Sequence, residues 1–348
     1  MPLHWNRFSR IQNSVFDLIG MTPLLRLSRV SKPTEVDILA KVEWYSPTGS
    51  LKDRIYYRMI TDAINRGELK PGMELLEAST GNAGISCSFV AGILGYPVTI
   101  VMPEGMSQER RKIMTAYGAK IVLTPGGESD VDLCISKVEE LRRTSPAQYW
   151  VPSQFSNSDN VLAHFETTGA EIWEQTEGHV DAFVASQGTG GTITGVGRYL
   201  RKHNPKVVLY AVEPAEAPLL SKSEWGSHRI EGIGDGFAPR NLDLNLLTGI
   251  ITTTSDEAIN MAQRLARLEG LFCGISSGSN VAAAMKLAKK HLRLKTIVTM
   301  LNDTGQRYFT TELCGETKNI KVPERAHPID AGTRVQLNKY QTRWEIIE

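Results

Sequence analysis

Lys52 is predicted to lie in the first turn of a helix, where positive charges are unfavourable. In the segment SPTGSLKDR, residues 46–54, Gly49 and Ser50 can supply a turn and a cap, which places Lys52 in the first helical turn. The helix dipole disfavours cations there, so a lysine is better tolerated if it is neutralised, as in an imine. Taken alone, the segment favours the simpler interpretation, a solvated lysine balanced by Asp53.

A glycine-rich segment with hydroxyl groups could bind a phosphate. SQGTGGTITG, residues 186–195, follows the apolar run DAFVA and begins a helix-like pattern. Backbone amides and hydroxyls at such a turn gather anions, and the donors here are Gly188, Thr189, Gly190, Gly191 and Thr192. The dinucleotide fingerprint is excluded because Ile193 replaces its third glycine, and no GKS or GKT follows. A plain tight turn remains the alternative.

Two more segments could bring polar groups to the start of a helix. EASTGNAG, residues 77–84, presents a sharp turn that could hold a carboxylate, and Asn82 could donate to a ring oxygen. CGISSGSN, residues 273–280, offers Ser276 and Ser277. Each segment could equally be an ordinary helix cap.

The elements around these segments alternate between strand-like and helix-like patterns. The first series has the strands VDILAKVEW, MELLEA, YPVTIVM and AKIVLT, with helices from Leu51, Asn82 and Ser107 and one near Asp130. A second series opens at YWVP and continues with DAFVAS, VVLYAVEP, GIITTT and KTIVTML, with helices from Gly191, from Ser255 and after Ser276. Such alternation predicts two α/β units whose parallel sheets bind ligands at their carboxyl ends. The loop region 214–247 is expected to cover the site.

Bulk composition limits the ligand. At 348 residues the chain exceeds the size of a single core, so two domains with a cleft are expected. Its 39 basic and 38 acidic residues nearly cancel, which indicates a small ligand rather than nucleic acid or a membrane. The four cysteines lie far apart and predict buried thiols, with no metal site. The chain has no signal segment or apolar span, so a cytoplasmic enzyme is expected.

The order and separation of the four segments resemble the cysteine synthase and cystathionine β-synthase family of pyridoxal-phosphate enzymes, from about residue 13, at IGMTPLLRL, to about 308. The resemblance implies fold-type II, similar to the tryptophan synthase β-subunit: two three-layer α/β domains with mostly parallel twisted sheets and the cofactor in the cleft. It implies a smaller domain at 46–157, a larger one formed by 13–45 and 158–320, a tail at 321–348, and a homodimer.

The same resemblance assigns roles to individual residues. Lys52 is the Schiff-base lysine, Asn82 contacts the ring hydroxyl, Gly188 to Thr192 bind the phosphate, and Ser276 contacts the pyridine nitrogen. The substrate carboxylate is assigned to Ser79, Thr80, Gly81, Ala83 and Gln154. A serine cannot hold the ring nitrogen protonated as an aspartate would, so β-elimination is favoured over transamination. Lys52 then acts as general base, and a thiol or sulfide attacks an aminoacrylate intermediate.

The sequence departs from the common family pattern in three segments. Ala83 stands where many members have threonine, and Asn302 and Asp303, in LNDTGQRY, stand where LPSSGERY is common. Asp235, in GIGDGF, replaces a small or aromatic residue in the loop that meets the nucleophile, and we count it among the substrate-binding candidates.

The leading function is cysteine synthesis from O-acetylserine or O-phosphoserine and sulfide. Cystathionine synthesis, in which serine or activated serine condenses with homocysteine or another amino-acid thiol, is the alternative. Serine or threonine dehydration is a third possibility. Two other classes of protein fit less well. A nicotinamide oxidoreductase is disfavoured because this sequence lacks the third glycine of the dinucleotide-binding motif, and a non-catalytic binding protein gives no reason to retain Lys52.

Overall fold

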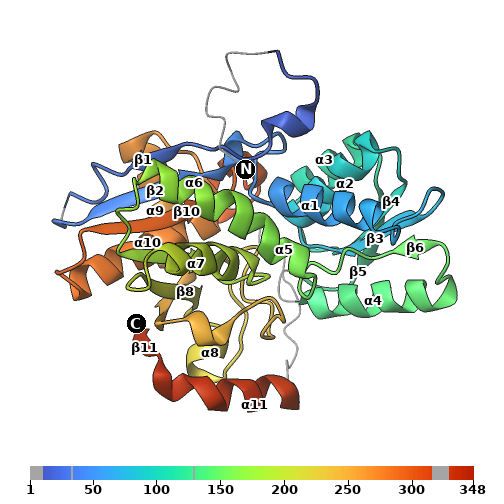
Figure 1. The fold of residues 1–348 in the computed structure, drawn as a ribbon. Coiled ribbons are helices and arrows are strands. Elements are labelled where there is room, and N and C mark those ends of the chain that lie inside the picture. The colour runs from blue at the N-terminus through green and yellow to red at the C-terminus, as the bar shows by residue number, and fades with distance from the viewer. Residues whose placement is uncertain (1–10, 33, 128–129, 316–328) are drawn as a thin grey trace.

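The structure, a computed structural model, describes residues 11–32, 34–127, 130–315 and 329–348. Its strands form two separate sheets, one of four strands and one of seven. The two sheets and their helices make two lobes side by side (Figure 1).

The smaller sheet is entirely parallel and has the order β5-β4-β3-β6. Its strands are β3 (Glu74–Ala78), β4 (Val98–Pro103), β5 (Lys120–Thr124) and β6 (Tyr149–Trp150). Helices α1 (Lys52–Asn65), α2 (Asn82–Ile93) and α3 (Gln108–Ala116) share one core with Leu75 and Ile100. Helix α4 (Val131–Thr144) packs with Leu76 and Val101. Because successive strand residues point to opposite faces, the helices cover both faces of the sheet.

The larger sheet has the order β1-β2-β10-β7-β8-β9-β11 and is parallel except for β1. Its strands are β1 (Leu24–Arg26), β2 (Asp37–Val42), β7 (Ala182–Ser186), β8 (Val208–Pro214), β9 (Gly249–Thr253), β10 (Thr296–Leu301) and β11 (Glu345–Ile347). Helices α9 (Ser255–Arg264) and α10 (Ile275–Lys290) pack in one core. Helices α6 (Ala170–Gln175), α7 (Gly191–His203), α8 (Leu219–Lys222) and α11 (Ala331–Tyr340) contribute to another. Helix α5 (Ser158–Ala163) adds Ala163 to the core of the smaller unit.

The predicted helix starts agree closely with the structure: α2 begins at Asn82, α7 at Gly191 and α1 one residue after Leu51. Two strands were assigned to the wrong series. VDILAKVEW was placed first in the first series, but β2 pairs in parallel with β10 in the larger sheet, on the side where the family resemblance had placed 13–45. The YWVP segment does not open the second series, because β6 pairs with β3 and closes the smaller sheet. Two strands of three residues, β1 and β11, were missed because so short a run shows little periodicity.

The cysteine prediction holds for three of the four residues. Cys87, Cys134 and Cys273 are buried thiols, but Cys314 is exposed. Cys314 ends a short 3-10 helix, Glu312–Cys314, after the last predicted strand. In the described ranges, no helix is long and apolar enough to cross a bilayer.

The domain division stays a proposal. All strands of the smaller sheet lie within 46–157, and all strands of the larger sheet lie outside that range. The proposed tail, 321–348, includes residues 321–328, which lie outside the described residues. Within its remainder, α11 packs on the larger unit and β11 pairs in parallel with β9, so this part of the tail extends the larger sheet.

Candidate active site

One pocket collects residues from the carboxyl ends of both sheets. Ser79 follows β3, Ser186 ends β7 and Asn302 follows β10. This is where parallel α/β sheets bind ligands, because their helix N-termini converge there. Of the residues predicted for the site, the following line the pocket: Lys52, Ser79, Thr80, Gly81, Asn82, Ala83, Gln154, Gly188, Thr189, Gly190, Thr192, Asp235 and Ser276. Gly191 does not line it, although it begins the adjoining helix.

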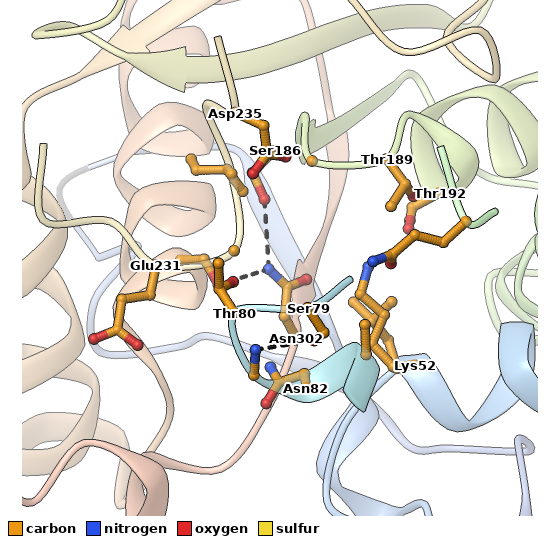
Figure 2. A pocket seen from close by; sticks show the side chains of 18 of the residues that line it. Lys52, Ser79, Thr80, Asn82, Ser186, Thr189, Thr192, Glu231, Asp235 and Asn302 are labelled. Atoms are coloured by element: carbon orange, nitrogen blue, oxygen red, sulfur yellow. Dashed lines mark hydrogen bonds between the residues drawn. The ribbon is translucent and has the colours of Figure 1, made fainter. Parts of the chain in front are cut away.

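Lys52 is the first residue of α1 and its side chain enters the pocket (Figure 2). Burial lowers its pKa to about 8, although Asp235 and Asp303 both act to raise it. The positive end of α1 disfavours the charged form as well. A lysine with a depressed pKa is a usable nucleophile and base near neutral pH. The lowered pKa is consistent with the sequence-based expectation that a lysine at this position is better tolerated when its side chain is uncharged.

The phosphate-binding prediction falls on the N-terminus of a helix of 13 residues. Gly190 precedes α7 with a φ of +77°, a left-handed conformation that favours glycine, and no side chain caps the helix. A Cβ on Gly188 would lie 2.5 Å from the carbonyl oxygen of Gly232, so the loop tolerates no larger residue. The amides of this turn and the hydroxyls of Thr189 and Thr192 suit a phosphate.

Gly191 has a packing role in the same loop. A Cβ on Gly191 would overlap the side-chain amide of Asn160. That amide donates to Thr189 Oγ1 at 3.0 Å and to the carbonyl oxygen of Gln154 at 2.8 Å. Asn160 therefore joins the loop at 188–192 to the segment that carries Gln154, and Gly191 leaves the space that the Asn160 side chain needs.

The turn before α2 is organised by Ser79. Its Oγ accepts hydrogen bonds from the amides of Gly81, at 3.0 Å, and Gly84, at 2.7 Å. The turn therefore presents a preformed helix N-terminus to the pocket, which suits a carboxylate. Gln154 donates to the carbonyl oxygen of Ala78 at 3.2 Å, so its amide lies beside the same turn.

Asn82 is held by two partners. Its Nδ2 donates to Asp303 Oδ2 at 2.6 Å, and its Oδ1 accepts from Arg307. Asp303 is fully buried and also accepts from Tyr308 at 2.8 Å. These contacts fix the orientation of the Asn82 side chain at the pocket wall. The second hydrogen on its Nδ2 is the group that could reach a ring oxygen, as the sequence predicted.

Several residues at the site were not predicted. His164 does not line the pocket but is buried next to Thr192, with Nε2 3.1 Å from Thr192 Oγ1 and Nδ1 2.9 Å from Thr168 Oγ1. Burial holds the pKa of His164 well below its usual value, so the ring is neutral. It begins a π-helical stretch, His164–Gly169, a helix type that is frequent at functional sites. A single histidine in a helical pattern gives no sequence signal of this contact.

An ion pair spans the pocket between the two lobes. Arg110, on α3, pairs with Glu231, which lies in the loop after β8. The Arg110 guanidinium also lies over the Tyr308 ring, 4.7 Å from its centroid. The loop region 214–247 therefore contributes to the pocket wall, because Glu231, Ile233 and Asp235 all line the pocket.

Asp235 brings a second carboxylate into the pocket. Burial raises its pKa to about 6, and the charge of Lys52 opposes that rise. At neutral pH Asp235 is therefore mostly ionised. Its charge lies within the same pocket as Lys52.

Together these groups fit pyridoxal phosphate. The cofactor needs an amine for a covalent link, an anion-binding turn and polar partners around its ring. Lys52 supplies the amine, the N-terminus of α7 supplies the anion site, and Asn82 and Ser276 line the same pocket. The tight glycines at 188 and 191 keep the phosphate cradle open to a ligand.

Comparisons with known proteins agree with this fit. Residues 15–303 match the family model described as "Pyridoxal-phosphate dependent enzyme". The chain is 47% identical to cysteine synthase A of Escherichia coli K12 over 304 residues, covering 85% of this chain and 93% of that protein. The crystal structure of a cysteine synthase from Entamoeba histolytica superposes with a TM-score of 0.84 at 34% identity and covers 99% of both chains. A hydrogen sulfide-producing enzyme from Fusobacterium nucleatum superposes with a TM-score of 0.82 at 36% identity, covering 86% of this chain and all of that one.

Proposed function

Because this chain belongs to the family of pyridoxal-phosphate-dependent enzymes, we propose that it is a cysteine synthase that replaces the leaving group of an activated serine with sulfide. The family, the fold class, the enzyme class and the cofactor predicted from the sequence are confirmed. One observation carries the reaction: Lys52 shares its pocket with two helix N-termini, one suited to a phosphate and one to a carboxylate.

Each anchor in the pocket has a distinct task. Lys52 Nζ would hold the cofactor covalently, while the α7 turn and the Thr189 and Thr192 hydroxyls would hold its phosphate. The turn at 79–83 would bind the substrate carboxylate, with Gln154 beside it. When bound, pyridoxal phosphate supplies an electron-withdrawing ring that acidifies the α-proton of an attached amino acid and lets a β-substituent leave.

Proton transfer falls to Lys52. Once the substrate amine has displaced it, its free amine, with a pKa of about 8, can accept the α-proton of the substrate. From O-acetylserine, acetate departs with the electron pair of the broken C–O bond, and sulfide forms the new bond to the same β-carbon. The loop region 214–247 would keep water from competing with sulfide.

The test compares wild-type protein with Lys52→Ala. Wild type should be yellow when purified and should make cysteine from O-acetylserine and sulfide. Lys52→Ala should lose the colour and about 10²–10⁴-fold or more in turnover. Lys70→Ala, at an exposed lysine away from the pocket, is the matched control and should change neither. A Lys52→Ala protein that turns over at the wild-type rate would overturn the proposal.

Asp235 supports a second candidate, condensation with an amino-acid thiol such as homocysteine. An ionised carboxylate in the pocket repels hydrosulfide but attracts the ammonium group of an amino acid. One charge-assisted hydrogen bond contributes about 1.5–3 kcal/mol, which corresponds to roughly tenfold or more in selectivity.

The second test is a ratio measured in wild type and Asp235→Asn. With the first substrate saturating, kcat/KM for homocysteine divided by that for sulfide should fall about tenfold or more in the variant. Equal changes in kcat/KM for both nucleophiles would show that Asp235 does not select between them and would remove the support for this candidate.

Two finer expectations also remain proposals. We infer from the family resemblance a homodimer, which sedimentation equilibrium would test by its mass, and a cytoplasmic location, which fractionation of the source cells would test. A monomer at micromolar concentration, or recovery outside the cytoplasmic fraction, would contradict them.

A further inference from the structure

Asn302 lies at the carboxyl end of β10, and its side chain enters the pocket beside Ser276. Its Nδ2 donates to Ser276 Oγ at 3.0 Å and approaches Ser186 Oγ at 3.4 Å (Figure 2). Its backbone is held on both sides: its amide donates to Ser277 Oγ at 2.8 Å, and its carbonyl oxygen accepts from the amide of Leu51 at 3.0 Å. Asn302 is thus tied both to the start of α10 and to the residue before Lys52.

The orientation of the Asn302 amide can be assigned from neighbouring backbone groups, because a backbone N–H can only donate and a backbone carbonyl oxygen can only accept. The amide of Ser186 donates to Asn280 Oδ1 at 2.7 Å, and Asn280 Nδ2 donates to the carbonyl oxygen of Met300 at 3.0 Å. These bonds fix which end of the buried Asn280 side chain carries the hydrogens. Asn280 Nδ2 therefore faces Asn302 Oδ1, at 3.4 Å, and Asn302 must turn its own NH2 group toward Ser276.

This polarity determines what Ser276 can do. Its Oγ accepts a hydrogen bond from Asn302 on one of its two lone pairs, and its hydroxyl hydrogen remains available to donate. Within the ranges that the structure describes, that hydrogen has no acceptor, and the side chain lines the pocket. A bound group beside Ser276 therefore meets a hydrogen-bond donor.

We propose that Asn302 is a positioning residue that makes Ser276 a donor toward the pocket and so keeps the cofactor's pyridine nitrogen as an unprotonated acceptor. The inference rests on the proposed contact between Ser276 and that nitrogen. An unprotonated ring withdraws electrons weakly, which favours departure of the β-substituent over reactions that need a long-lived carbanion. Asn302 is one of the positions where this chain departs from LPSSGERY, so the amide relay belongs to this chain's own sequence.

The decisive variant is Asn302→Asp, which keeps the shape of the side chain and the acceptor for Asn280 but reverses the polarity toward Ser276. The Ser276 hydroxyl would then donate to Asp and turn a lone pair toward the ring nitrogen. A nearby negative charge and an acceptor together should raise the pKa of that nitrogen by about one to three pH units. Asn302→Ala removes the donor without adding charge and should give a smaller change in the same direction.

The measurement is the ¹⁵N chemical shift of the pyridine nitrogen in holoenzyme reconstituted with ¹⁵N-labelled pyridoxal phosphate. Wild type should show the unprotonated position, and Asn302→Asp should move toward the protonated one. Asn204→Asp, at the far end of α7, adds the same charge while its side chain can still accept from the amide of Lys206, and should leave the signal unchanged.

An unchanged shift in Asn302→Asp overturns the proposal, and if that variant does not fold, an unchanged shift in Asn302→Ala does so. Ser276→Ala must also alter the signal, because an unaltered signal would show that Ser276 is not the partner of the ring nitrogen. Cysteine formation from O-acetylserine is measured separately on wild type. Failure of that assay would refute the proposed reaction without changing the reading of the nitrogen signal.

Discussion

Replacing Glu171 with glutamine tests how the start of α1 is anchored. Glu171, on α6, receives bonds from Arg54 at 2.6 and 2.8 Å and pairs with Lys41 at 2.8 Å. Arg54 also binds Glu43, at 2.7 and 2.9 Å. All four side chains are buried. Because two of them are basic and two are acidic, their charges balance. Arg54 lies two residues after Lys52, and the cluster therefore fixes the helix that presents the Lys52 amine to the pocket.

Glu171→Gln removes one negative charge and leaves a positive charge buried without compensation. Loss of one partner from a buried ion pair costs about 3–5 kcal/mol in free energy of unfolding. Arg54 and Lys41 hold the pKa of Glu171 well below its usual value, so the carboxylate is ionised in both the folded and unfolded chain near neutral pH. Its stabilisation decreases progressively as pH falls below the ordinary carboxyl pKa and is fully lost only below the lowered folded pKa, so the deficit of the variant should be constant from about pH 6 to 8.

The assay is denaturant unfolding of the holoenzyme, with cofactor affinity measured in parallel. Glu166→Gln is the matched control, because Glu166 pairs with Arg58 and its side chain is 48% exposed. That change should cost about 0–1 kcal/mol. Cofactor affinity should fall in Glu171→Gln and stay unchanged in Glu166→Gln. Equal losses of stability in the two variants, or a loss under about 1 kcal/mol at Glu171, would refute the reasoning.

Three further predictions concern cofactor binding. The rate at which stripped protein combines with pyridoxal phosphate should rise about tenfold per pH unit up to pH 8 and then level off, as the Lys52 ammonium loses its proton; a rate still rising at pH 10 would contradict the lowered pKa. Gly191→Ala should displace the Asn160 amide and weaken cofactor binding by roughly tenfold, measured by equilibrium titration, and unchanged affinity would show that the loop can adapt. His164→Phe should weaken binding by about 5- to 30-fold, because Thr192 loses its partner, with a shifted ³¹P signal of the bound phosphate; an unmoved signal would mean that Thr192 is oriented without the ring.

Local patterns in the sequence were sufficient for most of the site. Turn chemistry and the change from strand to helix period depend on neighbouring residues, so the segments around Lys52, Asn82, Gly190 and Ser276 could be located without a structure. The same patterns placed α2 and α7 at their observed first residues. They also predicted that both sheets would be mostly parallel, because strands separated by helices return in the same direction.

Contacts between distant residues required the tertiary structure. The Arg110–Glu231 ion pair joins residues that are 121 positions apart in the sequence. It forms only because the two lobes meet at this pocket. The amide relay through Asn280 and Asn302 depends on which polar ends face each other across β10 and α10. Burial also decided the charge states, since the pKa of Lys52 falls only when the folded chain removes water from its side chain. The sequence alone located most of the polar segments that line the pocket, whereas packing decided their partners, orientation and protonation, because those depend on distance and solvent exposure rather than on neighbours in the chain.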